Sequence, residues 1–277
     1  MDRFHEKPNG FVGEVNINVT DLARSIDFYT NVIGLNILNQ SERQAVLTAD
    51  GQTALVTLEQ PHSVLPKQGR TAGLYHFAIL LPERKDLAVF LRHLLQTGQR
   101  FGAADHYVSE AIYIDDPDGN GIEIYRDRPS SEWTWNDGFV DMATVQLDGD
   151  SLLAESDEEF TGLPGGTIIG HIHLHVSNIS EAENFYIKGL GFQVVSHYPQ
   201  AIFTSTGGYH HHIALNTWQG VGAPRPAQNS VGLNWYTLVF PSEEAREEAV
   251  ARLKGIGAAV TDYVTEDPSG NQIHLIV

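Results

Sequence analysis

Histidine and carboxylate side chains are the strong metal ligands that this 277-residue sequence offers, because it contains no cysteine. His171, His173 and His175 alternate along the run GHIHLHV, so they would share one face of a strand. His76 lies in the strand-like run GLYHFAIL, and Glu123 lies in GNGIEIYR. These three runs are therefore candidates for a metal site built from imidazole and carboxylate groups.

The chain repeats itself with an offset of roughly 150 residues, which means that its two halves share one architecture. For example, the stretch IDDPDGNGIEIY recurs as TEDPSGNQIHLI. The matching pairs are 25–38 with 182–195, 73–87 with 232–246, and 114–125 with 265–276.

Each half contains the same order of elements twice. Residues 12–20 alternate apolar and polar side chains, as a half-buried strand does. Asp21 can cap the helix that follows, Gly34 can end it, and three strand-like runs come next. Residues 73–125 repeat this order, and the second half gives two more such units. The sequence therefore predicts an α+β fold of four βαβββ modules.

The predicted domains follow the halves. We expect modules 1 and 2 to form a first domain over residues 9–126 and modules 3 and 4 to form a second over 168–277. Residues 127–167 differ in character from both and are expected to be a linker. Because exposed tryptophans are costly, we expect Trp133 and Trp135 of this linker to pack onto a domain.

Paired βαβββ modules with these motifs resemble the vicinal-oxygen-chelate superfamily, and in particular its two-domain catechol 2,3-dioxygenases. The superfamily also includes glyoxalase I and fosfomycin-resistance proteins, and the resemblance covers nearly the whole chain except the linker. It implies that two modules curl into one half-open barrel, with metal ligands on the first and last strands of a module. The positions it implies as ligands are Glu14, Thr57, His76 and Glu123 in the first half, and His171, Ala214, Trp235 and His274 in the second.

The way in which the modules pair decides which of these positions meet. Pairing within each half would offer Glu14, His76 and Glu123 in the first half and no carboxylate in the second. Pairing module 2 with module 3 gathers His76, Glu123 and His171 and leaves the position of Ala214 open. Two histidines and one carboxylate with free positions suit Fe(II) and dioxygen, with Mn(II) as the alternative metal. We therefore expect pairing 2+3 and 1+4, with the second half-open barrel free of metal.

The resemblance also implies roles around the metal. GGYHHHIAL (207–215) resembles the strand that carries the acid–base histidine of extradiol dioxygenases, which places His211 at that position. AIYIDDPDGNGIE resembles the family signature that ends in the glutamate ligand, and its substrate-binding tyrosine corresponds to Tyr113. DHYVSEAIY places His106 where the family often has a second substrate-binding histidine. The implied activity is extradiol cleavage of a small catechol-type aromatic diol with Fe(II) and dioxygen as co-substrate.

Simpler explanations exist for several of these residues. An inward histidine on a strand is more often a hydrogen-bonded core residue than a ligand, which we expect of His173 and His175. DPDGN is first of all a turn, and its recurrence as DPSGN before His274 shows that the turn needs no metal. The histidines at 210–212 could decorate the surface, although a place in mid-strand after two glycines argues against this.

Three other functions share the expected fold. Cleavage of a hydroquinone is barely separated from catechol cleavage by the sequence. A glyoxalase-type isomerase or lyase usually has a fourth ligand, which Thr57 and Ala214 cannot supply. A non-catalytic small-molecule-binding protein would have an apolar, aromatic cavity, against which the histidine-rich strands argue.

Composition restricts the partners. The chain carries 35 acidic and 17 basic residues, a formal net charge of −18. Such a surface repels phosphate backbones and anionic lipid, so we expect no nucleic-acid or membrane partner. No apolar run approaches the ~18 residues of a membrane span, and the first ten residues have no apolar core typical of a secretory signal. We therefore expect a cytoplasmic protein, and the sequence leaves a homo-oligomer open.

Overall fold

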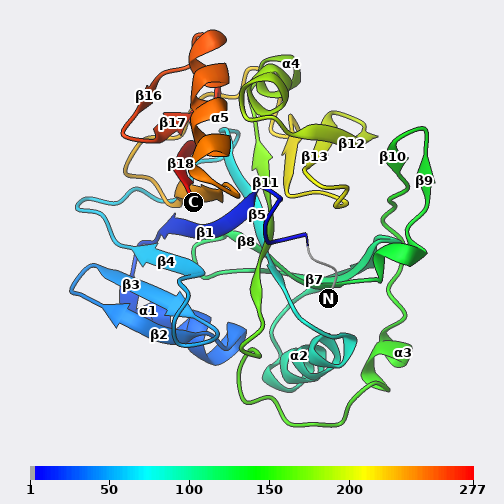
Figure 1. Ribbon diagram of the computed structural model, residues 1–277. Helices are drawn as coiled ribbons and strands as arrows, with labels where there is room; N and C mark the ends of the chain where they lie inside the picture. Colours follow the sequence, from blue (N-terminus) through cyan, green and yellow to red (C-terminus); the bar gives the residue numbers. More distant parts are fainter. Residues whose placement is uncertain (1–3) are drawn as a thin grey trace.

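Two eight-stranded sheets carry the fold of residues 4–277, the part of the chain that the computed structural model describes (Figure 1). The first sheet has the order β16-β17-β18-β15-β1-β4-β3-β2, and the second has the order β12-β13-β14-β11-β5-β8-β7-β6. Helices are few and lie outside the sheets, which confirms the predicted α+β fold of βαβββ modules.

Each sheet combines one module from each half of the chain. In the first sheet β1 pairs with β15 in antiparallel fashion, and in the second β5 pairs with β11 in the same way. The structure thus joins module 1 to module 4 and module 2 to module 3. The strands of the first sheet are β1 (Phe11–Asn18), β2 (Asn36–Gln40), β3 (Gln44–Thr48), β4 (Val56–Glu59), β15 (Gly232–Val239), β16 (Val260–Thr261), β17 (Val264–Glu266) and β18 (Gln272–Ile276). Those of the second are β5 (Gly73–Leu80), β6 (Gly102–Asp105), β7 (Ser109–Asp115), β8 (Gly121–Asp127), β11 (Ile168–His175), β12 (Gln193–Tyr198), β13 (Ala201–Ser205) and β14 (Ile213–Asn216).

One helix follows the first strand of each module. In the first, the Asp21 side chain accepts a hydrogen bond from the Arg24 amide, and Gly34 ends the helix with φ 91°, as predicted. The second half of this helix is π-helical, and the third module has the same feature. The helices are α1 (Leu22–Asp27) continued by η1 (Phe28–Ile33), α2 (Arg84–Thr97), α4 (Ile179–Glu183) continued by η3 (Asn184–Gly189), and α5 (Glu243–Gly255). No helix of residues 4–277 is long and apolar enough to cross a membrane.

The main core lies between the sheets and their helices. Helix α2 contributes Leu87, Phe90, Leu91 and Leu94, which follow the spacing of one helical face. The alternate residues of the central strands, such as Ile172 and Leu174 on β11, enter the same core. Because strand side chains alternate, the histidines between them face the opposite side of the sheet, as the sequence predicts.

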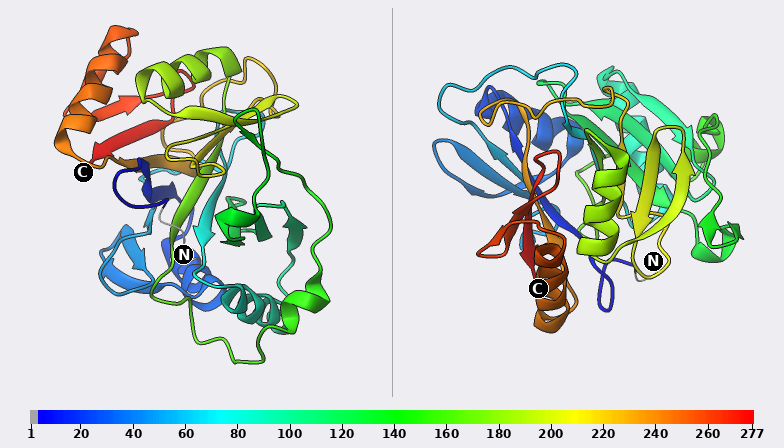
Figure 2. Two further views of the ribbon diagram at one scale, coloured as in Figure 1. Left: turned by 45° about the vertical axis from the view of Figure 1, so that its right-hand side comes forward. Right: turned by 90° about the horizontal axis from the view of Figure 1, so that it is seen from above.

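Residues 127–167 run around the outside of module 2 and reach module 1, where the Leu163 amide donates to the Gly34 carbonyl (Figure 2). They contain the short elements η2 (Ser130–Glu132), β9 (Trp135–Asn136), β10 (Phe139–Val140) and α3 (Gly149–Leu153). Trp133 is buried in a cluster with Val108 and Tyr209, which confirms its predicted packing. For Trp135 that prediction is wrong, because its side chain lies on the β9–β10 hairpin and is 37% exposed. The division into domains at 9–126, 127–167 and 168–277 stays a prediction.

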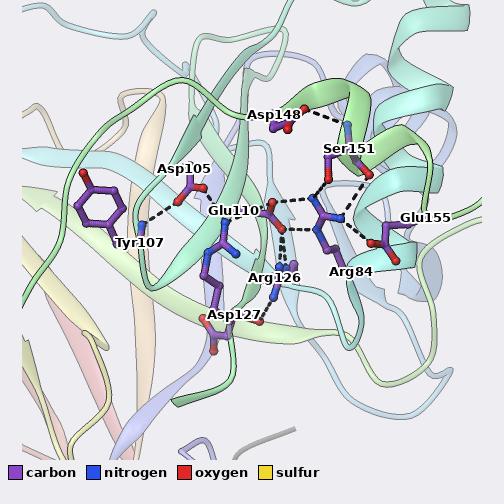
Figure 3. A network of polar contacts seen from close by, with 10 residues as sticks. Arg84, Asp105, Tyr107, Glu110, Arg126, Asp127, Asp148, Ser151 and Glu155 are labelled. Carbon is purple, nitrogen blue, oxygen red and sulfur yellow. Dashed lines mark hydrogen bonds and ion pairs between the residues drawn. The ribbon is translucent and has the colours of Figure 1, made fainter. Parts of the chain in front are cut away.

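Ion pairs hold this connecting segment against module 2 (Figure 3). The buried carboxylate of Glu110 on β7 accepts hydrogen bonds from Arg84 and Arg126. Arg84 also binds Ser151 in α3 and Glu155 just after it. Burial alone would raise the pKa of Glu110, but the neighbouring arginines hold it below its usual value. The segment is therefore fastened to the sheet by charge-assisted hydrogen bonds.

Candidate metal centre

Three strands of the second sheet bring His76, Glu123 and His171 together. In the register of these strands, Glu123 on β8 and His171 on β11 both lie opposite Ala78 on β5. His76 precedes Ala78 by two residues on β5 and therefore faces the same side of the sheet. Ala78 is fully buried, and its methyl group is too small to fill the space between its two neighbours. The three polar side chains converge in that space.

The potential ligand atoms of this triad are close to one another. His76 Nε2 lies 3.0 Å and His171 Nε2 lies 3.1 Å from the same oxygen, Oε2 of Glu123. All three ligand atoms lie within 4.8 Å of one another. His76 is 7% exposed, Glu123 is 2% exposed and His171 is 1% exposed, so bulk water has almost no access to the cluster.

The protonation states of the triad fit a divalent cation. Burial lowers the pKa of His171 to about 4, so the imidazole is neutral and its nitrogen lone pair is available. Burial raises the pKa of Glu123, but the two histidines outweigh this and hold it well below its usual value. His76 Nε2 is buried without a hydrogen bond of normal geometry, although Glu123 is near. A bound divalent cation would satisfy a buried nitrogen in this state beside a carboxylate.

Two residues of the triad, His76 and Glu123, line a cavity of about 380 Å³. Tyr113, His106 and His211, which the sequence predicts as substrate-binding and acid–base residues, all line it. The structure therefore brings the six predicted site residues to one place.

Tyr113 and His106 form a hydrogen-bonded pair in the cavity wall. Tyr113 on β7 pairs with Glu123 on β8, and its hydroxyl lies 2.6 Å from His106 Nε2. His106 Nδ1 lies 2.6 Å from the carbonyl oxygen of Ala143, to which it must donate. This leaves Nε2 of a neutral His106 as an acceptor for the Tyr113 hydroxyl. Burial and the charge of Glu123 raise the pKa of Tyr113 well above its usual value, so the phenol keeps its proton.

His211 packs against His171 of the triad. Its ring centroid is 4.1 Å from that of His171, and burial lowers its pKa well below the usual value. The histidines 210–212 are buried, so the surface explanation is wrong. They come just before β14, however, and not in mid-strand, because the pairing of β14 begins at Ile213.

Asp127 and His210 are site residues that sequence reasoning did not single out. Asp127 accepts a hydrogen bond from His210 Nε2 at 2.8 Å, which leaves Nδ1 of a neutral His210 without a proton. That Nδ1 lies 2.8 Å from Nδ1 of His211, which therefore donates to it. The chain of bonds holds His211 in the tautomer whose Nε2 is free to exchange a proton. The run HHH was a visible signal, but it did not distinguish the role of His210 from that of its neighbours.

His173 and His175 are hydrogen-bonded core residues, as predicted. Asn216 on β14 bridges them, with its amide oxygen 2.6 Å from His175 Nδ1 and its amide nitrogen 2.9 Å from His173 Nε2. His173 also touches the cavity, where Tyr75 and Trp218 pack edge-on or tilted against its ring. Neither aromatic residue carried a sequence signal.

The corresponding positions of the first sheet are arranged differently. Glu14 Oε1 accepts a hydrogen bond of 2.5 Å from the Thr57 hydroxyl, and burial raises the pKa of Glu14. Trp235 stacks on His274 with ring centroids 4.5 Å apart. The side chains at these four positions thus contact one another in two pairs.

His171 and His76 lie on the two central strands of the second sheet, β11 and β5, and Glu123 lies on the neighbouring β8. This fold and this triad point to one protein superfamily. The chain matches the family model described as the Glyoxalase/Bleomycin resistance protein/Dioxygenase superfamily over residues 12–124 and 168–275, and it belongs to that superfamily. It is 45% identical over 287 aligned positions to a catechol-2,3-dioxygenase of Bacillus subtilis (strain 168), with full coverage of both chains.

Solved structures agree on the fold. A putative dioxygenase from Bacillus subtilis subsp. subtilis str. 168 superposes with a TM-score of 0.67 at 13% identity, covering 96% of this chain and 84% of the other. Glyoxalase I from Zea mays superposes with a TM-score of 0.60 at 15% identity, covering 96% and 92%. At such identities the likeness concerns the fold and not the activity.

Proposed function

We propose that the protein is an extradiol ring-cleaving dioxygenase that acts on catechol-type aromatic diols, like a catechol 2,3-dioxygenase. The observation that carries the proposal is the convergence of His76, Glu123 and His171 beside a cavity that His106, Tyr113 and His211 line. The name of the relative that is 45% identical over its whole length supports the same reaction. A cytoplasmic location and a homo-oligomer stay predictions.

His76, Glu123 and His171 would hold the metal, which we assign as Fe(II) with Mn(II) as the alternative. When bound, such an ion supplies a Lewis-acidic, redox-active centre with open positions for a diol and dioxygen. Ala214 on β14 lies beside His173 and offers no fourth ligand, which favours an open centre over a glyoxalase-type one.

Tyr113 and His106 would bind one oxygen of the diol. Because His106 Nδ1 is committed to the Ala143 carbonyl, its Nε2 is the atom that can accept a proton from a substrate hydroxyl. The Tyr113 hydroxyl, now released from His106, can donate to the same substrate oxygen. The pair thus both orients the diol and takes up its proton.

His211 would serve the other side of the substrate. Because the proton of neutral His211 lies on Nδ1, its Nε2 can first accept the proton of the second diol hydroxyl and later give it to oxygen that becomes negatively charged as the ring is attacked. Asp127 and His210 support this step, because a positive charge on His211 spreads through the hydrogen bonds to a carboxylate. The nearly complete burial of His171 and Glu123 keeps bulk water from the same position.

The test is anaerobic metal analysis followed by catechol and then air. We expect one iron per chain, uptake of dioxygen and the yellow colour of a ring-fission product. Hydroquinone, offered in parallel, separates the two modes of ring cleavage. A zinc- or nickel-dependent isomerisation of a hemithioacetal, without oxygen uptake, would contradict the proposal.

A further inference from the structure

We propose that the segment of residues 4–10 positions the acid–base histidine, with Phe4 and His5 as its two positioning residues. The inference rests on the proposed function for the role of His211, and on the described residues 4–277 for the contacts that support it. The segment leads into β1 of the first sheet, so it brings a part of module 1 to a site that modules 2 and 3 otherwise build.

The segment is fastened to the loop that carries the acid–base histidine. This loop, residues 206–212, joins β13 to β14 in the second sheet. The Thr206 hydroxyl accepts a hydrogen bond of 3.0 Å from the Gly10 amide and donates one of 2.9 Å to the Gly10 carbonyl. A β-carbon added to Gly207 would collide with the Asn9 side chain, and its φ of 62° also favours glycine. Segment and loop are therefore packed closely along their length.

The backbone of Phe4 holds the last residue of the loop. Its carbonyl oxygen lies 3.1 Å from His212 Nε2, which must donate to it. Burial lowers the pKa of His212 well below its usual value, so the ring is neutral and its Nδ1 accepts from the Thr206 amide, 3.4 Å away. The His5 ring meets His212 edge-on, and His5 Nε2 donates to the Gly170 carbonyl at 2.7 Å. His5 thus joins the loop to β11, the strand that carries a metal ligand.

Phe4 and His5 also pack against Tyr209, which supports the carboxylate of Asp127. The Phe4 ring is tilted against the Tyr209 ring with centroids 5.1 Å apart, and the His5 ring meets it edge-on at 4.8 Å. Trp133 stacks on Phe4. Tyr209 is completely buried, and its hydroxyl donates to the two oxygens of Asp127 at 3.2 and 3.0 Å. The two side chains therefore restrict the Tyr209 ring, and with it the carboxylate.

Asp127 links these contacts to the acid–base histidine. Its carboxylate accepts from His210 Nε2 as well as from Tyr209, and His210 Nδ1 accepts from His211. A Tyr209 ring free to move would release the carboxylate from its position beside His210, and His211 would lose its fixed tautomer. Neither Phe4 nor His5 lines the cavity. The segment therefore acts on proton transfer through Asp127, without contact to the diol.

The first experiment is a double-mutant cycle on the full chain. One change is Asp127→Asn, and the other is the pair Phe4→Ala and His5→Ala. We expect the pair to lower kcat about 10-fold, with KM for the diol and iron content unchanged. In the Asp127→Asn background the pair should have little further effect, because its action passes through Asp127. Independent losses that multiply would overturn the inference, as would a raised KM with unchanged kcat.

Single substitutions in the segment keep the test sound if the paired variant folds poorly. His5→Gln retains a donor for the Gly170 carbonyl and should be faster than His5→Ala. The control Lys7→Ala changes an exposed side chain of the same segment and should behave as the unchanged protein. Equal rates in these three variants would overturn the assignment of His5.

NMR spectra of the histidine ring nitrogens give a readout that does not depend on turnover. They are recorded on the full chain with diamagnetic Zn(II) in place of iron. We expect the proton of His211 on Nδ1 and that of His210 on Nε2, and a mixture of tautomers after Phe4→Ala and His5→Ala. Unchanged tautomers in that variant would overturn the inference.

Absence of ring cleavage with every diol would contradict the proposed function instead. The spectra would still decide whether residues 4–10 hold the tautomers of His210 and His211, so the two failures are distinguishable.

Discussion

Nε2 of His171 lies 3.1 Å from Oε2 of Glu123, although 48 residues and the boundary between the two halves of the chain separate them. The contact exists because β11 and β8 flank β5 on opposite sides and place both residues opposite Ala78. The metal site is therefore a product of pairing module 2 with module 3.

Replacing His171 by alanine should abolish metal binding, whereas replacing His173 should not. Both histidines share one face of β11, but His173 is bonded to Asn216 and lies outside the triad. Loss of a ligand should lower iron affinity by more than the about 10- to 100-fold that is typical of outer residues. Iron content after anaerobic loading measures this. Equal iron loss in both variants would contradict the assigned ligand set.

Filling the space at Ala78 should remove the metal site without removing any ligand. A leucine there would project between Glu123 and His171 and push them apart, at a cost of about 1–3 kcal/mol in the free energy of unfolding. The control Ala78→Gly leaves the space open and should retain iron. Urea unfolding and iron content, measured on both variants, separate overpacking from loss of the site; full iron occupancy in Ala78→Leu would count against the geometry.

Breaking the Asp127–His210 bond should slow the reaction while leaving the metal in place. In Asp127→Asn the amide no longer enforces the proton on His210 Nε2, so His211 loses its fixed tautomer. We expect kcat to fall about 10- to 100-fold with little change in KM or iron content. A rise in KM with unchanged kcat would instead indicate that the pair only shapes the cavity.

The buried carboxylate of Glu110 should be a main source of acid sensitivity. Removing its charge in Glu110→Gln takes the carboxylate partner from Arg126 and leaves Arg84 with Glu155 alone, which should cost about 3–5 kcal/mol in the free energy of unfolding at neutral pH. Because the pKa of Glu110 is lowered on folding, its stabilisation is present above the unfolded pKa near 4.5 and is lost as pH falls further. Urea unfolding at pH 7 and pH 4 tests this. Glu155→Gln, whose carboxylate is partly exposed on the same Arg84, should cost under about 1 kcal/mol.

Local sequence patterns predicted much of this structure. Strand alternation assigned His76 and His171 to the side of the sheet away from the helices, and the turn chemistry of Asp21 and Gly34 located the first helix. The repeat indicated four modules, and the family resemblance led to the six residues that lie in the triad or line the adjoining cavity.

What escaped prediction depends on residues distant in sequence. The Asp127–His210 bond spans 83 residues, and neither partner has a local pattern that indicates the other. The bond from His106 to the Ala143 carbonyl spans 37 residues and involves a backbone atom, which side-chain identity cannot reveal. Trp135 lies on the β9–β10 hairpin and is 37% exposed, whereas Val140 on the other strand of the hairpin is buried, a difference that composition alone cannot reveal.

The pairing of β1 with β15 and of β5 with β11 also determines the order in which the chain can fold during synthesis. When the first half has emerged from the ribosome, its two leading strands each present an open edge, and both partners are still to be made. Such edges are sites for pairing with other chains. The leading strands of the first half can pair only after the second half is synthesised, or with strands of another copy of the chain. A fragment ending at residue 126 should therefore dimerise or aggregate.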